Sequence, residues 1–112
     1  MVSPEVGTVV LVTFPFSDLS ATKLRPAIVL AAADRDDWIL CQVTSAVYSD
    51  PRAIEITDSD FAVGSLARRS YARPGKLFSA NTSIMRRVVG SLKREKQETV
   101  VDAVIAILRP NI

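Results

Sequence analysis

Arg25 is the side chain of this sequence that most clearly suggests a chemical role. It stands directly before Pro26 and the apolar run PAIVLAAA, where a plain buried strand would begin with a neutral residue. A guanidinium group binds phosphate oxygens through paired, charge-assisted hydrogen bonds. Two interpretations stay open at this point: Arg25 binds a phosphorylated ligand, or it forms an ordinary ion pair at the edge of a strand.

Other reactive side-chain types are scarce. The chain contains no histidine, and Cys41 is its only cysteine. The missing histidine removes the commonest general acid or base and the commonest metal ligand. A single cysteine cannot form an internal disulfide or a cysteine-based metal cluster. The sequence therefore predicts a protein that uses no metal and no cofactor.

The charged residues are distributed unevenly along the chain. Between residues 34 and 60 there are seven acidic residues against two arginines, and between residues 68 and 96 there are nine basic residues against Glu95 alone. Such asymmetry can mark a half of the chain that binds a polyanion, with nucleic acid as the first candidate. The alternative is that these lysines and arginines only solvate a surface and a helix.

Length and composition favour one small globular domain over residues 1–112. The chain is 48% hydrophobic and 23% charged, which is enough to bury a core. The longest apolar runs are too short to cross a bilayer, and residues 1–10 lack the pattern of a secretory signal. We expect a cytoplasmic protein that contacts no membrane, and a homo-oligomer would help so small a chain to bury more surface.

Most of the chain has the pattern of short strands. Residues 7–14 (GTVVLVTF) predict a first strand, and residues 15–22 a polar loop. Residues 26–33 predict a second strand that begins at Pro26. A turn at residues 34–37 leads to a third strand at residues 38–45, in which Trp38 is assigned to packing. A fourth strand at residues 52–57 and two short ones at residues 75–79 and 87–89 complete the set.

Only the last segment is clearly helical. In residues 94–108 (REKQETVVDAVIAIL) apolar side chains recur at steps of three and four residues, and Pro110 follows. Strands followed by one terminal helix, without strand–helix–strand alternation, argue against a doubly wound parallel sheet. The predicted fold is mainly β, a small, strongly bent antiparallel barrel with a C-terminal α-helix packed on it.

The order of several short motifs resembles a known protein family. The segments GTVVLVTFPF at residues 7–16 and KLRPAIVL at residues 23–30 are similar to those of the MazF/PemK toxins of type II toxin–antitoxin pairs. Val43-Thr44-Ser45 and Gly90-Ser91-Leu92 continue the resemblance in the same order. No single motif is specific, but together they cover nearly the whole chain.

This resemblance implies a function as well as a fold. Members of the family are SH3-like barrels that work as homodimers, and they are metal-independent, sequence-specific endoribonucleases of single-stranded RNA. The family's catalytic arginine and threonine correspond to Arg25 and Thr44. A cognate antitoxin is expected to thread a disordered acidic segment across the same groove.

The chemistry of these residues agrees with that implication, except for proton transfer. The substrate's own 2′-hydroxyl can act as nucleophile, while Arg25 stabilises the phosphorane and the hydroxyl of Thr44 or Ser45 donates a hydrogen bond. Guanidinium stays protonated at neutral pH and is a poor general base. Asp18, Glu55, Asp58, a hydroxyl relay or water remain as candidates for moving the protons.

RNA binding would require stacking side chains and cations along the backbone. The stacking candidates are aromatic residues in or beside predicted loops, although each could equally belong to the core: Phe16, Tyr48 and Tyr71. The candidate backbone contacts are basic residues on both sides of Arg25 in the chain: Lys23, Arg68, Arg69, Arg73 and Lys76.

Two other functions remain as alternatives. A gyrase-poisoning toxin of the same fold, similar to CcdB, would act through a C-terminal tryptophan, and residues 106–112 contain none. A non-catalytic nucleic-acid-binding barrel is the other alternative, because the usual acid and base side chains are so few.

Overall fold

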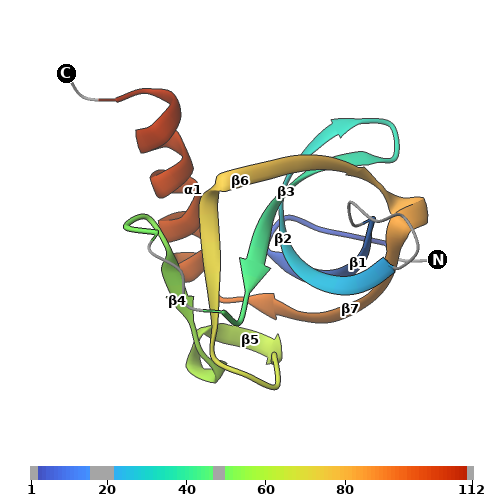
Figure 1. Ribbon diagram of the computed structural model, residues 1–112, viewed down its shortest axis with the longest axis horizontal. Helices are drawn as coiled ribbons and strands as arrows, with labels where there is room; N and C mark the ends of the chain where they lie inside the picture. Colours follow the sequence, from blue (N-terminus) through green and yellow to red (C-terminus); the bar gives the residue numbers. More distant parts are fainter. Residues whose placement is uncertain (1–2, 16–21, 47–49, 111–112) are drawn as a thin grey trace.

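The computed structural model describes residues 3–15, 22–46 and 50–110, which form one curled antiparallel sheet and a C-terminal helix (Figure 1). The strands follow the order β4-β6-β3-β2-β1-β7-β5 across the sheet. Their bounds are β1 Thr8–Pro15, β2 Thr22–Asp34, β3 Asp37–Thr44, β4 Ile54–Ile56, β5 Phe61–Gly64, β6 Ser70–Asn81 and β7 Met85–Leu92. Short 3₁₀ turns at Asp58–Asp60 and Thr82–Ile84 precede β5 and β7. The predicted mainly β fold, a small antiparallel barrel with a terminal helix, is confirmed.

The sheet buries side chains on both of its faces. Because neighbouring residues of a strand point to opposite faces, Val9 and Val10 of β1 belong to different clusters. One cluster contains Val9 and Ile28 and is covered by Val100 of the helix and Phe61 of β5. The other contains Val10 and Leu40 and lies on the opposite face, with Trp38 packed against it as expected.

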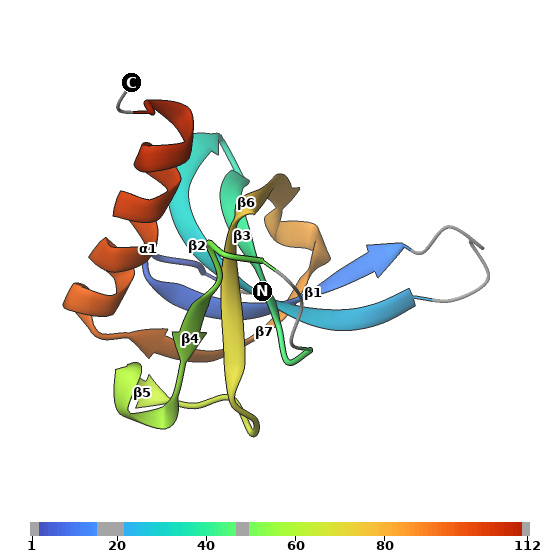
Figure 2. The ribbon, with the colours of Figure 1, turned by 60° about the vertical axis from the view of Figure 1, so that its left-hand side comes forward.

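The helix α1, Arg94–Leu108, has the bounds that its periodicity predicts. It packs on the outside of the curled sheet, beside β6 (Figures 1 and 2). Of its own side chains, Val100 and Val104 are buried, whereas Ile105 and Leu108 are 52% and 72% exposed. The last turn of the helix therefore presents apolar side chains to solvent. Within the described ranges, no helix has the length and apolar character needed to cross a membrane.

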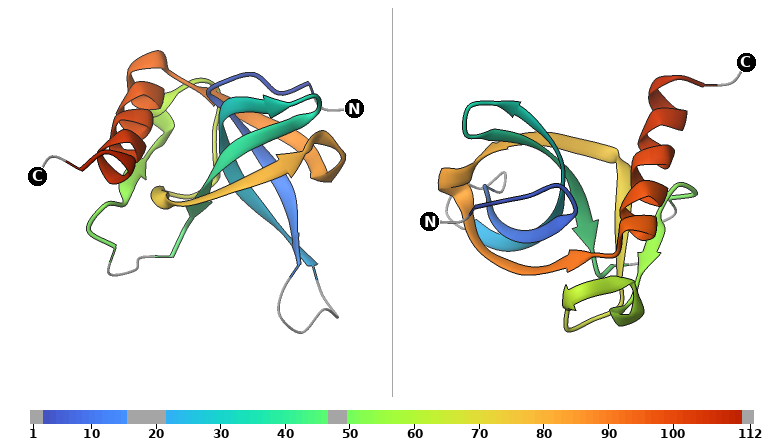
Figure 3. Two further views of the ribbon diagram at one scale, coloured as in Figure 1. Left: turned by 90° about the horizontal axis from the view of Figure 1, so that it is seen from above. Right: turned by 180° about the vertical axis from the view of Figure 1, so that it is seen from behind.

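The second strand begins earlier than its composition predicts. β2 starts at Thr22 instead of Pro26, so Arg25 lies inside the strand, opposite Val12 of β1, and Pro26 lies opposite Leu11. Pairing with β1 continues to the very end of the ribbon, where Thr22 faces Pro15. The β1–β2 ribbon extends away from the body of the barrel (Figures 2 and 3).

Two other strand predictions need correction, and a third strand, β5, was not predicted. The segments at residues 75–79 and 87–89 are the central parts of the longer strands β6 and β7. β6 bends midway (Figure 1), and its register against β3 shifts between Cys41 and Val43. Pro74 and Gly75 lie in this part of β6 and hide the strand pattern, because neither favours an extended ladder. β5 has only four residues, too few for alternation to be recognised.

Candidate active site

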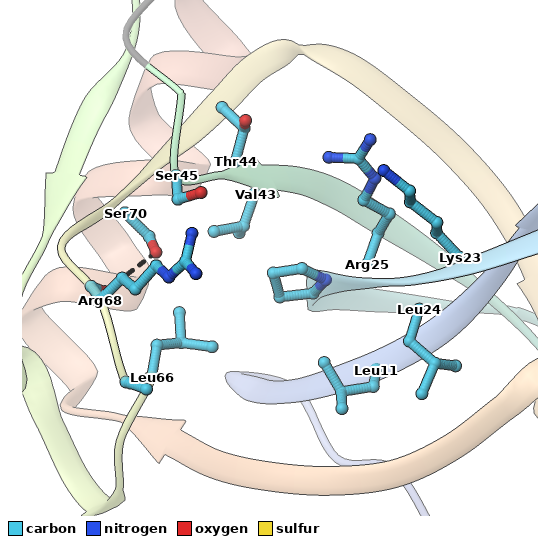
Figure 4. A pocket seen from close by; sticks show the side chains of 12 residues that line it. Leu11, Lys23, Leu24, Arg25, Val43, Thr44, Ser45, Leu66, Arg68 and Ser70 are labelled. Atoms are coloured by element: carbon cyan, nitrogen blue, oxygen red, sulfur yellow. Dashed lines mark hydrogen bonds between the residues drawn. The ribbon is translucent and has the colours of Figure 1, made fainter.

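A cavity of about 300 Å³ opens between β2, the end of β3 and the connection from β5 to β6 (Figure 4). Its floor is apolar and its polar groups lie on three separate segments of the chain. The lining residues are Leu11, Lys23, Leu24, Arg25, Pro26, Val43, Thr44, Ser45, Leu66, Ala67, Arg68 and Ser70.

The register of β2 and β3 explains why Arg25 and Thr44 meet in this cavity. The ladder between the two strands begins at the pair Ala27–Gln42 and runs away from the site. Continued by two residues in the other direction, the same register would place Arg25 opposite Thr44. Pro26 has no backbone N–H with which to extend the ladder. The cavity therefore lies where the paired part of the two strands ends.

Arg25 and Lys23 lie on the same face of β2, because they are two residues apart in one strand. Figure 4 shows the guanidinium of Arg25 and the ammonium of Lys23 side by side, near Thr44. Arg25 is half-buried and Lys23 is exposed. Two cations close together in a partly enclosed hollow make a favourable place for a phosphate group.

The Thr44 hydroxyl is positioned by a local hydrogen bond. Its Oγ1 accepts a hydrogen bond from the backbone N–H of Ala46 at 3.1 Å, and the residue is only 4% exposed. A threonine hydroxyl has one proton to donate and two lone pairs. Because Ala46 occupies a lone pair, the O–H proton stays available to a ligand oxygen in the cavity.

Arg68 supplies a second guanidinium from the opposite wall. Its side chain extends from the β5–β6 connection toward the centre of the cavity (Figure 4). The hydroxyl of Ser70 donates a hydrogen bond of 3.0 Å to the Arg68 carbonyl oxygen and so fixes the backbone there. Among the residues that the structure describes, none forms a hydrogen bond or ion pair with the guanidinium of Arg68.

The other basic candidates lie away from this cavity. Arg69 forms an exposed ion pair with Glu55, with 3.1 Å between Nε and the carboxylate oxygen. Arg73 pairs with Asp50 at 3.0 Å in a less exposed position. The hydrogen bond from Arg73, with a second one from the backbone N–H of Arg52, lowers the pKa of Asp50 below its ordinary value. Lys76 is exposed on β6 and does not line the cavity.

Several sequence candidates cannot be placed at the site, or do not reach it. Phe16, Asp18 and Tyr48 fall outside the described residues. Tyr71 lies on β6 opposite Thr44 without lining the cavity. Neither Glu55 nor Asp58 lines it, so the described wall of the cavity carries no carboxylate.

Sequence reasoning missed Ser70 and most of the apolar lining. The missed apolar residues come from β1, β2 and the β5–β6 connection: Leu11, Leu24 and Leu66. No local pattern distinguishes a leucine on a cavity floor from a leucine in the core. If β5 had been predicted from the sequence, residues 66–70 would have become candidates, because that strand leads directly into them.

Comparison with known proteins identifies the family. The family model of the PemK-like, MazF-like toxins of type II toxin–antitoxin systems matches residues 5–108. The chain belongs to this family. The match spans both halves of the cavity, from Arg25 to Ser70. A search of curated protein sequences gave no match.

Solved structures of similar fold agree with this assignment. A MazE–MazF structure from Deinococcus radiodurans superposes with a TM-score of 0.75 at 18% identity, covering 96% of this chain and 97% of that one. An endoribonuclease bound to its cognate antitoxin, from a mycobacterial species, gives 0.74 at 13% identity, covering 98% and 99%. The Mycobacterium tuberculosis toxin MazF-mt6 gives 0.70 at 15% identity, covering 94% and 99%. At these identities the likeness is one of fold.

Proposed function

We propose that this toxin is a metal-independent, sequence-specific endoribonuclease that cleaves single-stranded RNA. One observation carries the proposal: Arg25 and Thr44, on different strands, line the same cavity where the β2–β3 ladder ends. Arg68 adds a further positive charge from the opposite wall. The solved structures of similar fold support the activity, because they include an endoribonuclease.

The cavity supplies what an internal transesterification of RNA requires. The ribose 2′-oxygen attacks the neighbouring phosphorus and loses its proton, and the bond from phosphorus to the 5′-oxygen breaks as that oxygen gains a proton. The products are a 2′,3′-cyclic phosphate and a 5′-hydroxyl. The transient phosphorane carries extra negative charge on its non-bridging oxygens, where fixed hydrogen-bond donors stabilise it most.

Each side chain then has a defined task. Arg25 binds two phosphorane oxygens in the planar geometry that guanidinium favours. Thr44 donates its free hydroxyl proton to one of the oxygens, and Lys23 and Arg68 hold the phosphates on either side. The proton transfers are carried by solvent or relayed through hydroxyl groups such as that of Ser45, and Asp18 is the acidic candidate.

The biological setting follows from the family. A toxin of a type II system is held inactive by a protein antitoxin, and solved structures of similar fold contain such complexes. We expect the cognate antitoxin of this toxin to cover the positively charged cavity with an acidic segment. We also expect a cytoplasmic homodimer, so that two cavities can act on one RNA strand.

RNA cleavage by purified protein in excess EDTA tests the proposal. The wild-type protein should cut a long single-stranded RNA at discrete sites and leave cyclic phosphate ends. Arg25→Ala and Thr44→Val should each lower the cleavage rate by about 100-fold or more, because each removes a donor to the phosphorane. Arg94→Ala, which removes an exposed arginine paired with Glu98 on α1, is the matched control and should cut normally.

Any of three results would overturn the proposed activity or its proposed active site. Absence of cutting by the wild-type protein, together with inhibition of DNA gyrase, would assign the chain to the gyrase-poisoning toxins. RNA binding without cutting by the wild-type protein would make it a non-catalytic nucleic-acid-binding barrel. Equal cutting by the wild-type protein and Arg25→Ala would place the active site elsewhere.

A further inference from the structure

A second, smaller hollow adjoins the cavity of Arg25 and Thr44. Its volume is about 210 Å³, and it shares residues 66–68 of the β5–β6 connection with the larger cavity as a common wall. The rest of its lining comes from Thr57, Asp58 and Arg69. A single-stranded RNA that crosses the larger cavity has more than one nucleotide to place, and this hollow adjoins that cavity.

Apart from Arg68 on the shared wall, the polar groups of the hollow do not favour a phosphate. The Arg69 guanidinium is occupied by Glu55. The Thr57 hydroxyl donates a hydrogen bond of 3.2 Å to the carboxylate of Asp60, and its oxygen lies 3.0 Å from the Ser59 hydroxyl.

The Asp58 carboxylate, by contrast, makes no hydrogen bond or ion pair with any other residue in the described ranges. It is exposed and lines the hollow. An open carboxylate repels a phosphate and accepts hydrogen bonds from neutral N–H groups.

We propose that this hollow binds the base of a nucleotide next to the scissile linkage, and that Asp58 makes the hollow favour guanine. The inference rests on the proposed ribonuclease function. Single-stranded RNA is read by hydrogen bonds to the Watson–Crick edges of splayed bases. Arg68, on the shared wall, holds the phosphate between the two nucleotides.

Guanine fits a carboxylate better than the other three bases do. On its Watson–Crick edge it presents N1–H and the N2 amino group side by side, which matches the two oxygens of Asp58. Adenine and cytosine place a ring acceptor beside their amino group, and uracil has one imino donor between two carbonyls. A bidentate contact of this kind discriminates against the wrong base by about 5- to 150-fold.

Two measurements test the subsite. The first maps cleavage sites of the wild-type protein in a random RNA pool, where one position beside the cut should be enriched in guanine. The second measures binding of single-stranded oligonucleotides that contain one guanine or one inosine in a uridine background. Every nucleotide carries 2′-deoxyribose, so that no cutting occurs. Inosine lacks only the N2 amino group, so the wild-type protein should bind it at least about 5-fold more weakly.

The variants separate a base-reading role from a general effect of charge. Asp58→Asn should abolish both the guanine enrichment and the discrimination against inosine, because the amide keeps one acceptor oxygen and turns an N–H2 donor toward the second donor of guanine. Asp102→Asn makes the same chemical change at an exposed position of α1 and should preserve both.

If the Asp58→Asn protein still enriches guanine beside the cut, or still binds guanine more tightly than inosine, the proposed subsite is wrong, even if RNA cleavage is normal. Equal binding of guanine and inosine by the wild-type protein would overturn it as well. If the wild-type protein cuts no RNA, the ribonuclease proposal fails, but inosine discrimination that depends on Asp58 would still establish the hollow as a base-binding site.

Discussion

Replacement of Gly90 by alanine should destabilise the protein strongly, because β5 and β7 approach each other there without room for a side chain. Gly90 lies opposite Gly64 in the ladder. A methyl group at position 90 would overlap the carbonyl oxygen of Val63 and lie 2.8 Å from Cδ2 of Phe61. An ordinary contact begins at 3.4 Å, so Phe61 would have to move by at least about 0.6 Å.

The cost can be bounded from the burial of Phe61. Its side chain is only 7% exposed and packs in the cluster that contains Val9 and Val100. Strain from one extra methyl group in a packed core costs about 1–3 kcal/mol. Complete loss of a buried phenylalanine costs about 3–5 kcal/mol. We therefore expect Gly90→Ala to lower the free energy of unfolding by about 2–4 kcal/mol, and Tm by roughly 8–16 °C.

Gly75→Ala is the matched control for this experiment. A methyl group at position 75 would meet only Cδ1 of Ile107, at 4.0 Å. Both variants can be compared with the wild-type protein by urea unfolding and by thermal melts followed by circular dichroism. A loss below about 1 kcal/mol for Gly90→Ala, or equal losses for the two variants, would refute the claim that close approach of β5 and β7 determines the cost.

Two further predictions concern pH. Arg73 keeps the pKa of Asp50 below its ordinary value of 3.8, so the ionised carboxylate stabilises the fold above that pH and this contribution is lost as the pH falls further. Urea midpoints between pH 6 and pH 3 should therefore fall less for Asp50→Asn than for the wild-type protein, and parallel curves would contradict the assignment. Burial raises the pKa of Cys41 from 9.0 to about 11, so the contribution of its neutral thiol is complete below pH 9 and is lost as the pH rises toward 11. The urea midpoint of Cys41→Ala should therefore fall less between pH 9 and pH 11 than that of the wild-type protein. An equal fall for the two proteins would exclude this thiol as the source of the pH dependence.

The parts of the fold that were predictable are those with a local cause. The helix at Arg94–Leu108 follows from apolar spacing alone. The turn between β2 and β3 follows from the polar cluster at residues 34–37. β5 and the full length of β6 could not be predicted, because their pairing partners are distant in the chain and local preference is weak in both.

The candidate site divides in the same way. Arg25 and Thr44 were predictable from motifs, and the structure places them in one cavity. Nothing local distinguishes Arg68, which enters that cavity, from Arg69, which pairs with Glu55 outside it. The two are adjacent in a connection whose direction is set by β5–β7 pairing, so only the fold assigns their positions.

Pro26 connects the fold to the site more directly than its place in the sequence suggests. It was expected to begin a strand, yet it lies inside β2 and pairs with β1 on one side only. A proline is tolerated there because that part of β2 has no hydrogen-bonded neighbour on the other side. If residue 26 could donate to β3, the ladder could extend toward Arg25 and Thr44 and close the space between them. The residue that looks like a boundary marker therefore lies where the pairing of the two strands ends, beside the cavity that Arg25 and Thr44 line.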